Sequence, residues 1–311
     1  MSGAATTTNK EVVIPEFKQI LGHPAPLWML FMTEFWERFA FYGIRWALVL
    51  YIVAQFYGGA AVGQQDANLT YGSYLALVYA GAVFGGYVAD RVIGYQRSIL
   101  IGAVFMAAGL FAITIPDPDI FKLGLATIIV GNGMFKPNIS TMVGKLYTLN
   151  DTRRDSGFTI FYMGINAGAF VAPILTQILA QKIFNTGDTP AYKVVFFAAG
   201  VGMLISLVWF YIGRSTLKGI GAPVEGGESR TRAVMVAIGA AAVIPLVYFL
   251  LALGAATLQI ILTIMFVVLA LIAARVGGRL GRRALFGIDV TAGVGLLGFA
   301  GLLGVRTIQD A

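Results

Sequence analysis

The first long apolar stretch of the chain, residues 27–57, reads LWMLFMTEFWERFAFYGIRWALVLYIVAQFY. It is longer than the roughly 20 apolar residues that an α-helix needs to cross the hydrocarbon core of a bilayer. Four ionisable side chains interrupt it, namely Glu34, Glu37, Arg38 and Arg45. Each would cost about 2.5–3.5 kcal/mol near the centre of a membrane. The stretch therefore predicts a transmembrane helix whose charged side chains face protein or a water-filled cavity.

The charged residues of this stretch share one helical face. Positions 34, 37, 38, 41, 42 and 45 recur at intervals of three and four residues, the spacing of one face of an α-helix. A base beside two carboxylates neutralises one of them, and repulsion between like charges then favours protonation of the other. Glu34 or Glu37 is therefore a candidate proton carrier beside Arg38, which leaves Arg45 and Lys136 free to hold an anionic substrate group. A cluster that only fixes helix packing is the plainer alternative.

Composition also argues for a membrane protein. Of the 311 residues, 58% are hydrophobic and 12% are charged, and the mean hydropathy is +0.80. Soluble domains carry about twice this charged fraction, so a soluble enzyme or a nucleic-acid-binding protein is not expected. The chain has no cysteine, which excludes thiolate metal sites, and a single histidine, His23, which leaves histidine-based metal sites and catalysis without enough ligands. His23 precedes Pro24 before the first apolar stretch and is expected to be solvated.

Nine apolar segments are long enough to cross a bilayer. They lie at roughly 27–57, 69–93, 98–115, 121–147, 157–184, 191–213, 233–253, 256–274 and 284–305. Polar and turn-rich sequences separate them. The pattern predicts an all-α integral membrane protein in which residues 214–232 link the first six segments to the rest.

The basic residues predict the orientation. If the N-terminus is cytoplasmic, most of the 22 lysines and arginines fall in cytoplasmic segments, as the positive-inside rule requires. The net charge of +7 then follows from topology, and a nucleic-acid partner is not needed to explain it. Residues 1–26 are polar and mixed in charge, so we expect a cytoplasmic segment and not a secretory signal peptide.

Further motifs occur at the ends or in the interior of later spans. Gly81 and Gly85 form one small-xxx-small pair, and Gly164 and Gly168 form another, a spacing that lets helices approach closely. The strings that contain or adjoin these glycines and Lys136 are GGYVADRVIG (85–94), FKPNIS (135–140) and RRDSGFTIFYMGIN (153–166).

Together with the pattern ExxERFxFYG from Glu34 to Gly43, these strings resemble the proton-dependent oligopeptide transporter family of the major facilitator superfamily. The resemblance covers residues 27–213, which it implies form a six-helix N-terminal bundle. It implies that residues 233–274 form the transmembrane hairpin that bacterial members place between their two bundles. Residues 275–311, a basic loop and a last apolar segment, are atypical, and the C-terminal bundle of the family is not present in the chain.

The resemblance also implies a role for each matching residue. The proton-coupling residues would be Glu34, Glu37 and Arg38. The substrate-binding residues would be Arg45, Lys136, Tyr42, Tyr79 and Asn166. The cytoplasmic gating loop would contain Gly85, Gly86, Asp90 and Arg91. No catalytic residue, metal or cofactor is expected, because the proton itself is the coupling ion.

The expected function is proton-coupled symport of di- and tripeptides across the plasma (inner) membrane, or the N-terminal portion of such a transporter. A second chain could supply the missing bundle. One alternative is a related facilitator for nitrate or another small anion, since the ExxER pattern does not by itself specify the substrate. An alternative of a different class is a non-transporting membrane scaffold that associates through an exposed face bearing Gly81, Gly85, Gly164 and Gly168.

Overall fold

The structure is a computed structural model that describes residues 14–185, 187, 189–223, 229–253, 260, 263 and 264. The chain divides into two units, Met1–Ala255 and Ala256–Ala311, and the fold below is that of the first. The segments expected to span the membrane at 256–274 and 284–305 lie, apart from residues 260, 263 and 264, outside the described residues.

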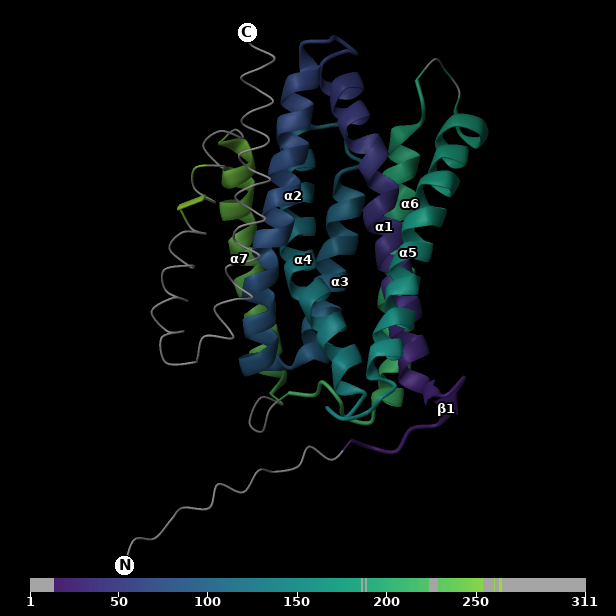
Figure 1. Cartoon of the computed structure of the whole chain (residues 1–311). Coiled ribbons are helices and arrows are strands. Elements are labelled where there is room, and N and C mark those ends of the chain that lie inside the picture. The colour runs from purple at the N-terminus through teal and green to yellow at the C-terminus, as the bar shows by residue number, and fades with distance from the viewer. Residues whose placement is uncertain are drawn as a thin grey trace, which may run out of the picture. The chain divides into compact units, whose positions relative to one another are not determined.

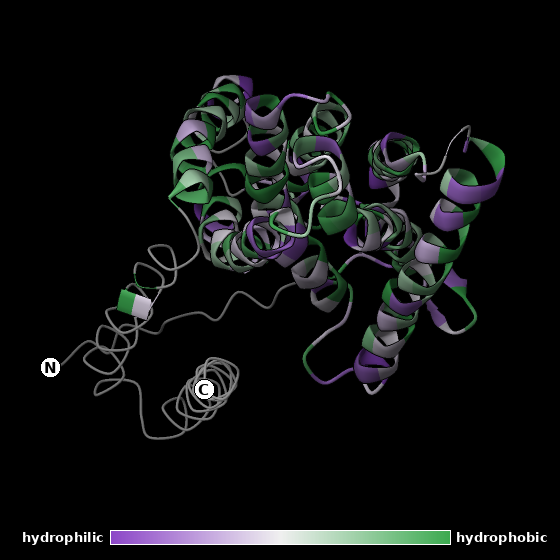
Figure 2. Ribbon diagram, turned by 90° about the horizontal axis from the view of Figure 1, so that it is seen from above, coloured by the Kyte–Doolittle hydropathy of each residue, from purple (hydrophilic) through white to green (hydrophobic). Residues whose placement is uncertain are grey.

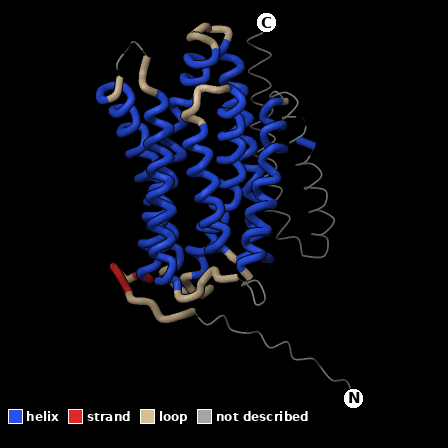
Figure 3. Tube along the Cα trace, turned by 180° about the vertical axis from the view of Figure 1, so that it is seen from behind, coloured by secondary structure: helices blue, strands red, loops and turns tan. Residues whose placement is uncertain are grey.

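Seven α-helices make up most of the described part of the chain (Figure 1). They are α1 (Ala25–Phe56), α2 (Gly63–Val88), α3 (Tyr95–Ala112), α4 (Pro118–Lys145), α5 (Arg154–Ile178), α6 (Tyr192–Gly213) and α7 (Arg230–Ala252). Shorter elements are the two-residue strands β1 (Gln19–Ile20) and β2 (His23–Pro24) and the helical turns η1 (Ala89–Ile93), η2 (Leu179–Ile183) and η3 (Arg214–Leu217). Figure 3 shows that the two strands are the only departure from helix and loop in this part.

Local sequence explains where several helices begin and turn. The α4 helix starts at Pro118, and its N-cap Asp117 accepts hydrogen bonds from the backbone N–H groups of Asp119 and Ile120 at 3.0 and 2.9 Å. Gly94 separates η1 from α3 with a φ of +79°, a conformation that glycine adopts without steric cost. Asp117 and Gly94 thus mark turns between helices that cross the bundle in opposite directions.

Two groups of helices surround the interior of the bundle. The α1 helix packs most extensively on α5 and α6, while α4 packs on α2 and α3 and carries α7 on its outer side (Figures 1 and 3). The helices α3 and α6 join the two groups. By contrast, α1 and α4 approach each other little along their backbones, so side chains must bridge the space between them.

Glycines bring the helices of each group into close contact. A Cβ atom at Gly85 of α2 would overlap the backbone of Gly133 on α4, and one at Gly168 of α5 would lie 2.5 Å from the carbonyl oxygen of Phe35 on α1. Gly164 likewise packs on α1. The close approach predicted from the small-xxx-small pairs is confirmed, but these glycines face neighbouring helices of the same bundle. The prediction of an exposed glycine face, on which the alternative of a non-transporting membrane scaffold depended, is wrong.

Most of these helices have the length and composition of membrane spans. Six helical stretches qualify in the described part of the chain, beginning at residues 25, 63, 95, 154, 192 and 230. Figure 2 shows hydrophobic residues along much of the helical ribbon, with polar residues between them. The 28-residue α4 is not among them, since its sequence includes Lys122, Asn132, Lys136 and Lys145. The predicted all-α membrane fold is confirmed for these residues, and α4 belongs to it as the packed centre of one group.

A small hairpin before α1 joins the loop between α4 and α5. The strands β1 and β2 pair in antiparallel register, and Leu21 and Gly22 between them have φ values of +50° and +78°. The Nδ1 atom of His23 hydrogen bonds to the hydroxyl of Tyr147 at 2.9 Å, and His23 is buried. The expectation that His23 is solvated is wrong, because the hairpin folds its ring against a segment 124 residues away.

Candidate functional site

The middle of α1 presents three ionisable side chains to the protein interior. Glu34 and Glu37 are fully buried and Arg38 is 6% exposed. The guanidinium of Arg38 forms an ion pair and two hydrogen bonds with the Glu37 carboxylate, and its Nε lies 3.3 Å from Oε1 of Glu34. One turn of helix, the spacing that the sequence predicted, thus brings two carboxylates to one guanidinium.

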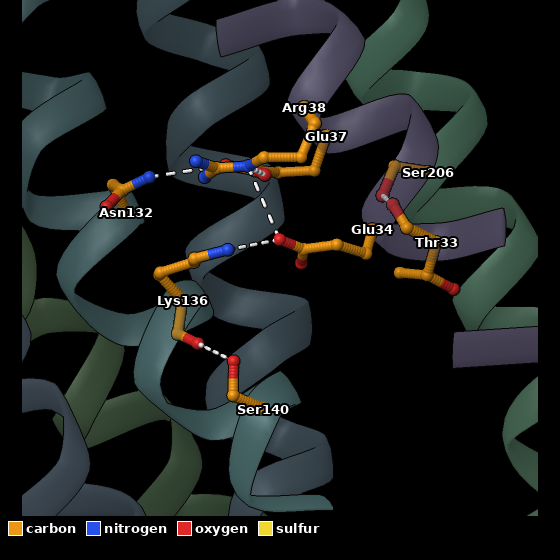
Figure 4. A network of polar contacts seen from close by, with 8 residues as sticks. All are labelled: Thr33, Glu34, Glu37, Arg38, Asn132, Lys136, Ser140 and Ser206. Carbon is orange, nitrogen blue, oxygen red and sulfur yellow. Dashed lines mark hydrogen bonds and ion pairs between the residues drawn. The ribbon is translucent and has the colours of Figure 1, made fainter. Parts of the chain in front are cut away.

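The α4 helix supplies the other half of this cluster (Figure 4). The Lys136 ammonium forms an ion pair with Oε1 of Glu34, and the side-chain amide of Asn132 donates to Oε1 of Glu37 at 3.2 Å. Asn132 and Lys136 lie one helical turn apart, so their side chains leave α4 on the same face. These two contacts cross the space where the backbones of α1 and α4 lie apart.

The cluster has two carboxylates and two cations, so its formal charge is balanced. Such balance is what a buried ionic group requires, because an unpaired charge in an apolar interior is far more costly than a pair. The prediction that Lys136 is free is wrong for this arrangement, since its charge is paired with Glu34. The Oε2 atom of Glu34 has no hydrogen-bond partner within the described part of the chain. The acidic end of the cluster can therefore accept one more donor.

A second basic site lies two helical turns along α1. Arg45 is exposed, and its Nε donates to the hydroxyl of Tyr71 on α2 at 2.7 Å. The Tyr42 ring lies between the two arginines, with its centroid 5.9 Å from the Cζ of Arg38 and 5.4 Å from that of Arg45. Cation–π contacts of this kind stabilise a guanidinium beside an aromatic face. The α1 helix thus connects the buried cluster to an accessible arginine.

The remaining predicted substrate residues lie on accessible surfaces. Tyr79 of α2 is 74% exposed and belongs to the group of tyrosines around Arg45. Asn166 of α5 is also exposed, although the glycines on either side of it, Gly164 and Gly168, pack against α1. The structure brings Tyr42 and Tyr79 toward Arg45. It gives no contact between Asn166 and the ionic cluster among the described residues.

The predicted gating residues fall into two environments. Gly85 is buried against α4, and Gly86 is half-buried one residue later. Asp90 and Arg91 lie in η1 with exposed side chains, and the Tyr95 hydroxyl donates a hydrogen bond to Oδ1 of Asp90. The glycines therefore contribute packing, while the charged pair sits in the turn before α3.

Sequence reasoning did not single out Asn132, Tyr71 or Tyr74. Asn132 could have been found from its position one turn before Lys136 on the same helix. Tyr71 and Tyr74 are one turn apart on α2, but the sequence around a tyrosine in a membrane span does not indicate which residue it contacts. Their significance depends on which face of α2 packs against α1.

Comparisons with known proteins agree with this geometry. The family model described as POT family matches residues 96–249. The chain is 40% identical over 240 residues to the uncharacterized transporter YclF of Bacillus subtilis, covering 76% of this chain and 47% of the relative. It is 40% identical over 209 residues to the peptide transporter YePEPT of Yersinia enterocolitica and 37% identical over 223 residues to dipeptide and tripeptide permease B of Aliivibrio fischeri. The last two matches cover 66% and 71% of this chain and 39% and 43% of those relatives.

Solved structures lead to the same family. A crystal structure of a peptide transporter POT in complex with sulfate matches with a TM-score of 0.66 and 35% identity over 86% of this chain and 55% of that one. The chain spans about half the length of the proteins that it matches. The predicted N-terminal bundle of the major facilitator type is confirmed by this likeness. In sequence and in structure the chain resembles the POT family, which is a family of membrane transporters and not of enzymes.

Proposed function

We propose that the chain carries the proton-coupling half of a symporter for di- and tripeptides. The observation that supports this most directly is the shared carboxylate: Glu34 contacts both Arg38 and Lys136. A buried group of two acids and two bases is charge-balanced as it stands, so a proton added to one acid releases one base for another anion. The names of the peptide-transporting relatives supply the substrate class.

The proposed mechanism couples a proton to a substrate carboxylate through Lys136. When Glu34 is protonated, its attraction for the ammonium of Lys136 falls, and the ammonium can turn to the carboxyl group of a peptide. Lys136 is the member of the cluster with access for this, because its side chain is 29% exposed whereas both glutamates are fully buried. Arg45 offers a second cation for the same group, in a guanidinium geometry that suits bidentate binding.

A peptide also brings an ammonium group, which requires a carboxylate elsewhere. Among the described residues, the acids that are buried within candidate membrane spans are Glu34 and Glu37, and both belong to the ionic cluster. We therefore propose that a further bundle, on a second chain or a longer one, completes the site. The proton is the only coupling ion in this proposal, and no cofactor takes part.

The proposed location is the plasma membrane, with the N-terminus and the loop between α4 and α5 on the cytoplasmic side. The distribution of lysine and arginine supports this orientation. Transport of nitrate or another small anion would use the same Lys136 and Arg45 without a site for an ammonium group. The peptide-transporting relatives favour peptides over that alternative.

The test is uptake of labelled dialanine into liposomes that contain the purified chain, driven by a proton gradient. Uptake that depends on the gradient and is lost in Glu37→Gln would support the proposal. Binding of dialanine without uptake, weakened at least tenfold in Lys136→Gln, would support a substrate half-site that needs a second bundle. Nitrate uptake without any binding of dialanine would contradict the peptide assignment.

A further inference from the structure

The hydroxyl group of Tyr74 is the feature that the arrangement above leaves unexplained. Tyr74 lies on α2 and is 0% exposed, and its hydroxyl has no hydrogen-bond partner within the described part of the chain. Buried polar groups are nearly always paired, because leaving one unpaired forfeits its bonds to water without replacement. A tyrosine here in place of phenylalanine thus indicates that the hydroxyl is used in another arrangement of the site.

The surroundings of Tyr74 are charged, which separates it from other buried tyrosines. Its hydroxyl interacts electrostatically with Glu37, Arg38 and Arg45 of α1 and with Tyr71 of its own helix. Tyr51 of α1 offers the contrast. Its hydroxyl is also buried and without a hydrogen-bond partner among the described residues, but its ring packs on other aromatic rings, including Phe121 at 5.5 Å and Phe196 at 5.0 Å between ring centroids.

Arg38 is shared unequally between its two carboxylates. In the present arrangement it binds Glu37 closely and lies 3.3 Å from Glu34, whose other cation is Lys136. After Glu34 has given up its proton, and while Lys136 still binds the peptide carboxyl group, Glu34 keeps Arg38 as its only cation. Arg38 is then drawn from Glu37 toward Glu34, and Glu37 keeps only the amide of Asn132 as a donor.

We propose that Tyr74 is a positioning residue for proton coupling, whose hydroxyl donates to the Glu37 carboxylate when Arg38 turns to Glu34. This inference rests on the proposed function, since it assumes that Lys136 leaves Glu34 during the cycle. Tyr74 then holds Glu37 ionised and oriented until a proton arrives. Arg38 and the Tyr74 hydroxyl thus alternate as hydrogen-bond donors to the Glu37 carboxylate.

The experiment measures the protonation of Glu37 directly and does not require transport. Carboxyl infrared absorption of the full chain in liposomes is followed against pH, and the band lost in Glu37→Gln identifies Glu37. Lys136→Gln mimics the release of Glu34, so Tyr74→Phe is compared with and without it. In the Lys136→Gln background, we expect Tyr74→Phe to move the midpoint of the Glu37 band upward by about one pH unit, because a donor to the ionised form is lost.

Two comparisons separate this role from packing. With Lys136 present, Tyr74→Phe is expected to move the midpoint of the Glu37 band much less, because Arg38 then binds the Glu37 carboxylate. Tyr51→Phe removes an equally buried and unpaired hydroxyl and is expected to leave the midpoint unchanged in both backgrounds. Circular dichroism of each variant checks that the helices are intact, and phenylalanine preserves the volume of the ring.

Each outcome decides between the alternatives. Equal midpoints for Tyr74→Phe and its parent in the Lys136→Gln background would overturn the role of Tyr74 while leaving the proposed function intact. The same would hold if Tyr51→Phe moved the midpoint as much as Tyr74→Phe. If Glu37→Gln removed no band that changes with pH, proton coupling at Glu37 would itself be overturned, and the role of Tyr74 with it.

Discussion

Lys136 of α4 forms an ion pair with Glu34 of α1 and joins two helices that otherwise approach each other little. The two residues are 102 positions apart in the chain. Glu34 is fully buried, whereas the Lys136 side chain is partly exposed, so the two partners are not equivalent. Removing the base leaves two buried carboxylates on Arg38, while removing the acid leaves the neutral pair of Arg38 with Glu37 and a lysine that can reach solvent.

The first prediction follows from this asymmetry. Lys136→Met is expected to lower the free energy of unfolding by about 3 kcal/mol, the low end for breaking a buried ion pair, because Lys136 is partly exposed. Glu34→Gln is expected to cost clearly less. Thermal unfolding of both variants in detergent measures the difference. Equal losses of unfolding free energy in the two variants would show that the two partners contribute equally, and would contradict the argument from their unequal burial.

The second prediction concerns the amide that binds Glu37. Asn132→Leu removes its hydrogen bond to Oε1 of Glu37 and is expected to cost about 1–3 kcal/mol of unfolding free energy. Asn138→Leu is the matched control on the same helix, since the Asn138 amide donates to Ser98 and to the Met134 carbonyl and not to the cluster.

Both asparagine variants are expected to be destabilised, which denaturation in detergent would show. Proton-driven uptake or dialanine binding is expected to change its pH profile only in Asn132→Leu. A shifted profile in Asn138→Leu of the same size would mean that the effect reflects general loosening of α4 and not the contact with Glu37.

Much of this arrangement follows from periodicity along single helices. The spacing of Glu34, Glu37 and Arg38 predicted one face of one helix, and hydrophobic segment length predicted the spans. Both depend on residues that are close in sequence. The sequence also predicted that Lys136 lies within a span, because its neighbours are apolar.

Contacts between helices could not be predicted in the same way. The partner of Lys136 and the donor role of Asn132 depend on the register of α4 against α1, which single-helix periodicity does not determine. His23 was expected to be solvated because nothing nearby in sequence buries it, yet Tyr147 on a distant loop does so. The small-xxx-small pairs predicted close approach correctly but could not tell an internal neighbour from a second chain.

The third prediction tests that internal packing. Gly85→Ala places a Cβ atom against the backbone of Gly133, where no side chain can move aside, and is expected to cost about 1–3 kcal/mol. Gly72 is the control on the same helix, because a Cβ atom there meets nothing within 4 Å. Gly72→Ala is expected to be neutral or to gain about 0.5–1 kcal/mol from helix propensity. Equal unfolding temperatures in detergent would contradict the close contact of α2 with α4.

The fourth prediction concerns the hairpin before α1 at low pH. Hydrogen bonds from the side chain and backbone N–H of Arg153 lower the pKa of Asp151 to about 2. The same arginine donates to the Gln19 side chain and to the Gly22 carbonyl, both at 3.1 Å, so Asp151 holds it in place for the hairpin. A carboxylate with a lowered pKa stabilises the folded form fully above its unfolded pKa near 4, and this contribution is lost as the pH falls toward 2.

Pepsin, which is active in this range, provides the measurement through cleavage within residues 16–24. At pH 4, the wild-type hairpin is expected to be cut more slowly than that of Asp151→Asn, because only the ionised carboxylate orients Arg153. At pH 2, where about half of the folded molecules have Asp151 protonated, the difference between the two rates is expected to be much smaller. The comparison at each pH cancels the pH dependence of the protease. A difference that persists undiminished at pH 2 would show that Asp151 acts by its shape and not by its charge, and equal rates at pH 4 would show that Arg153 holds the hairpin without it.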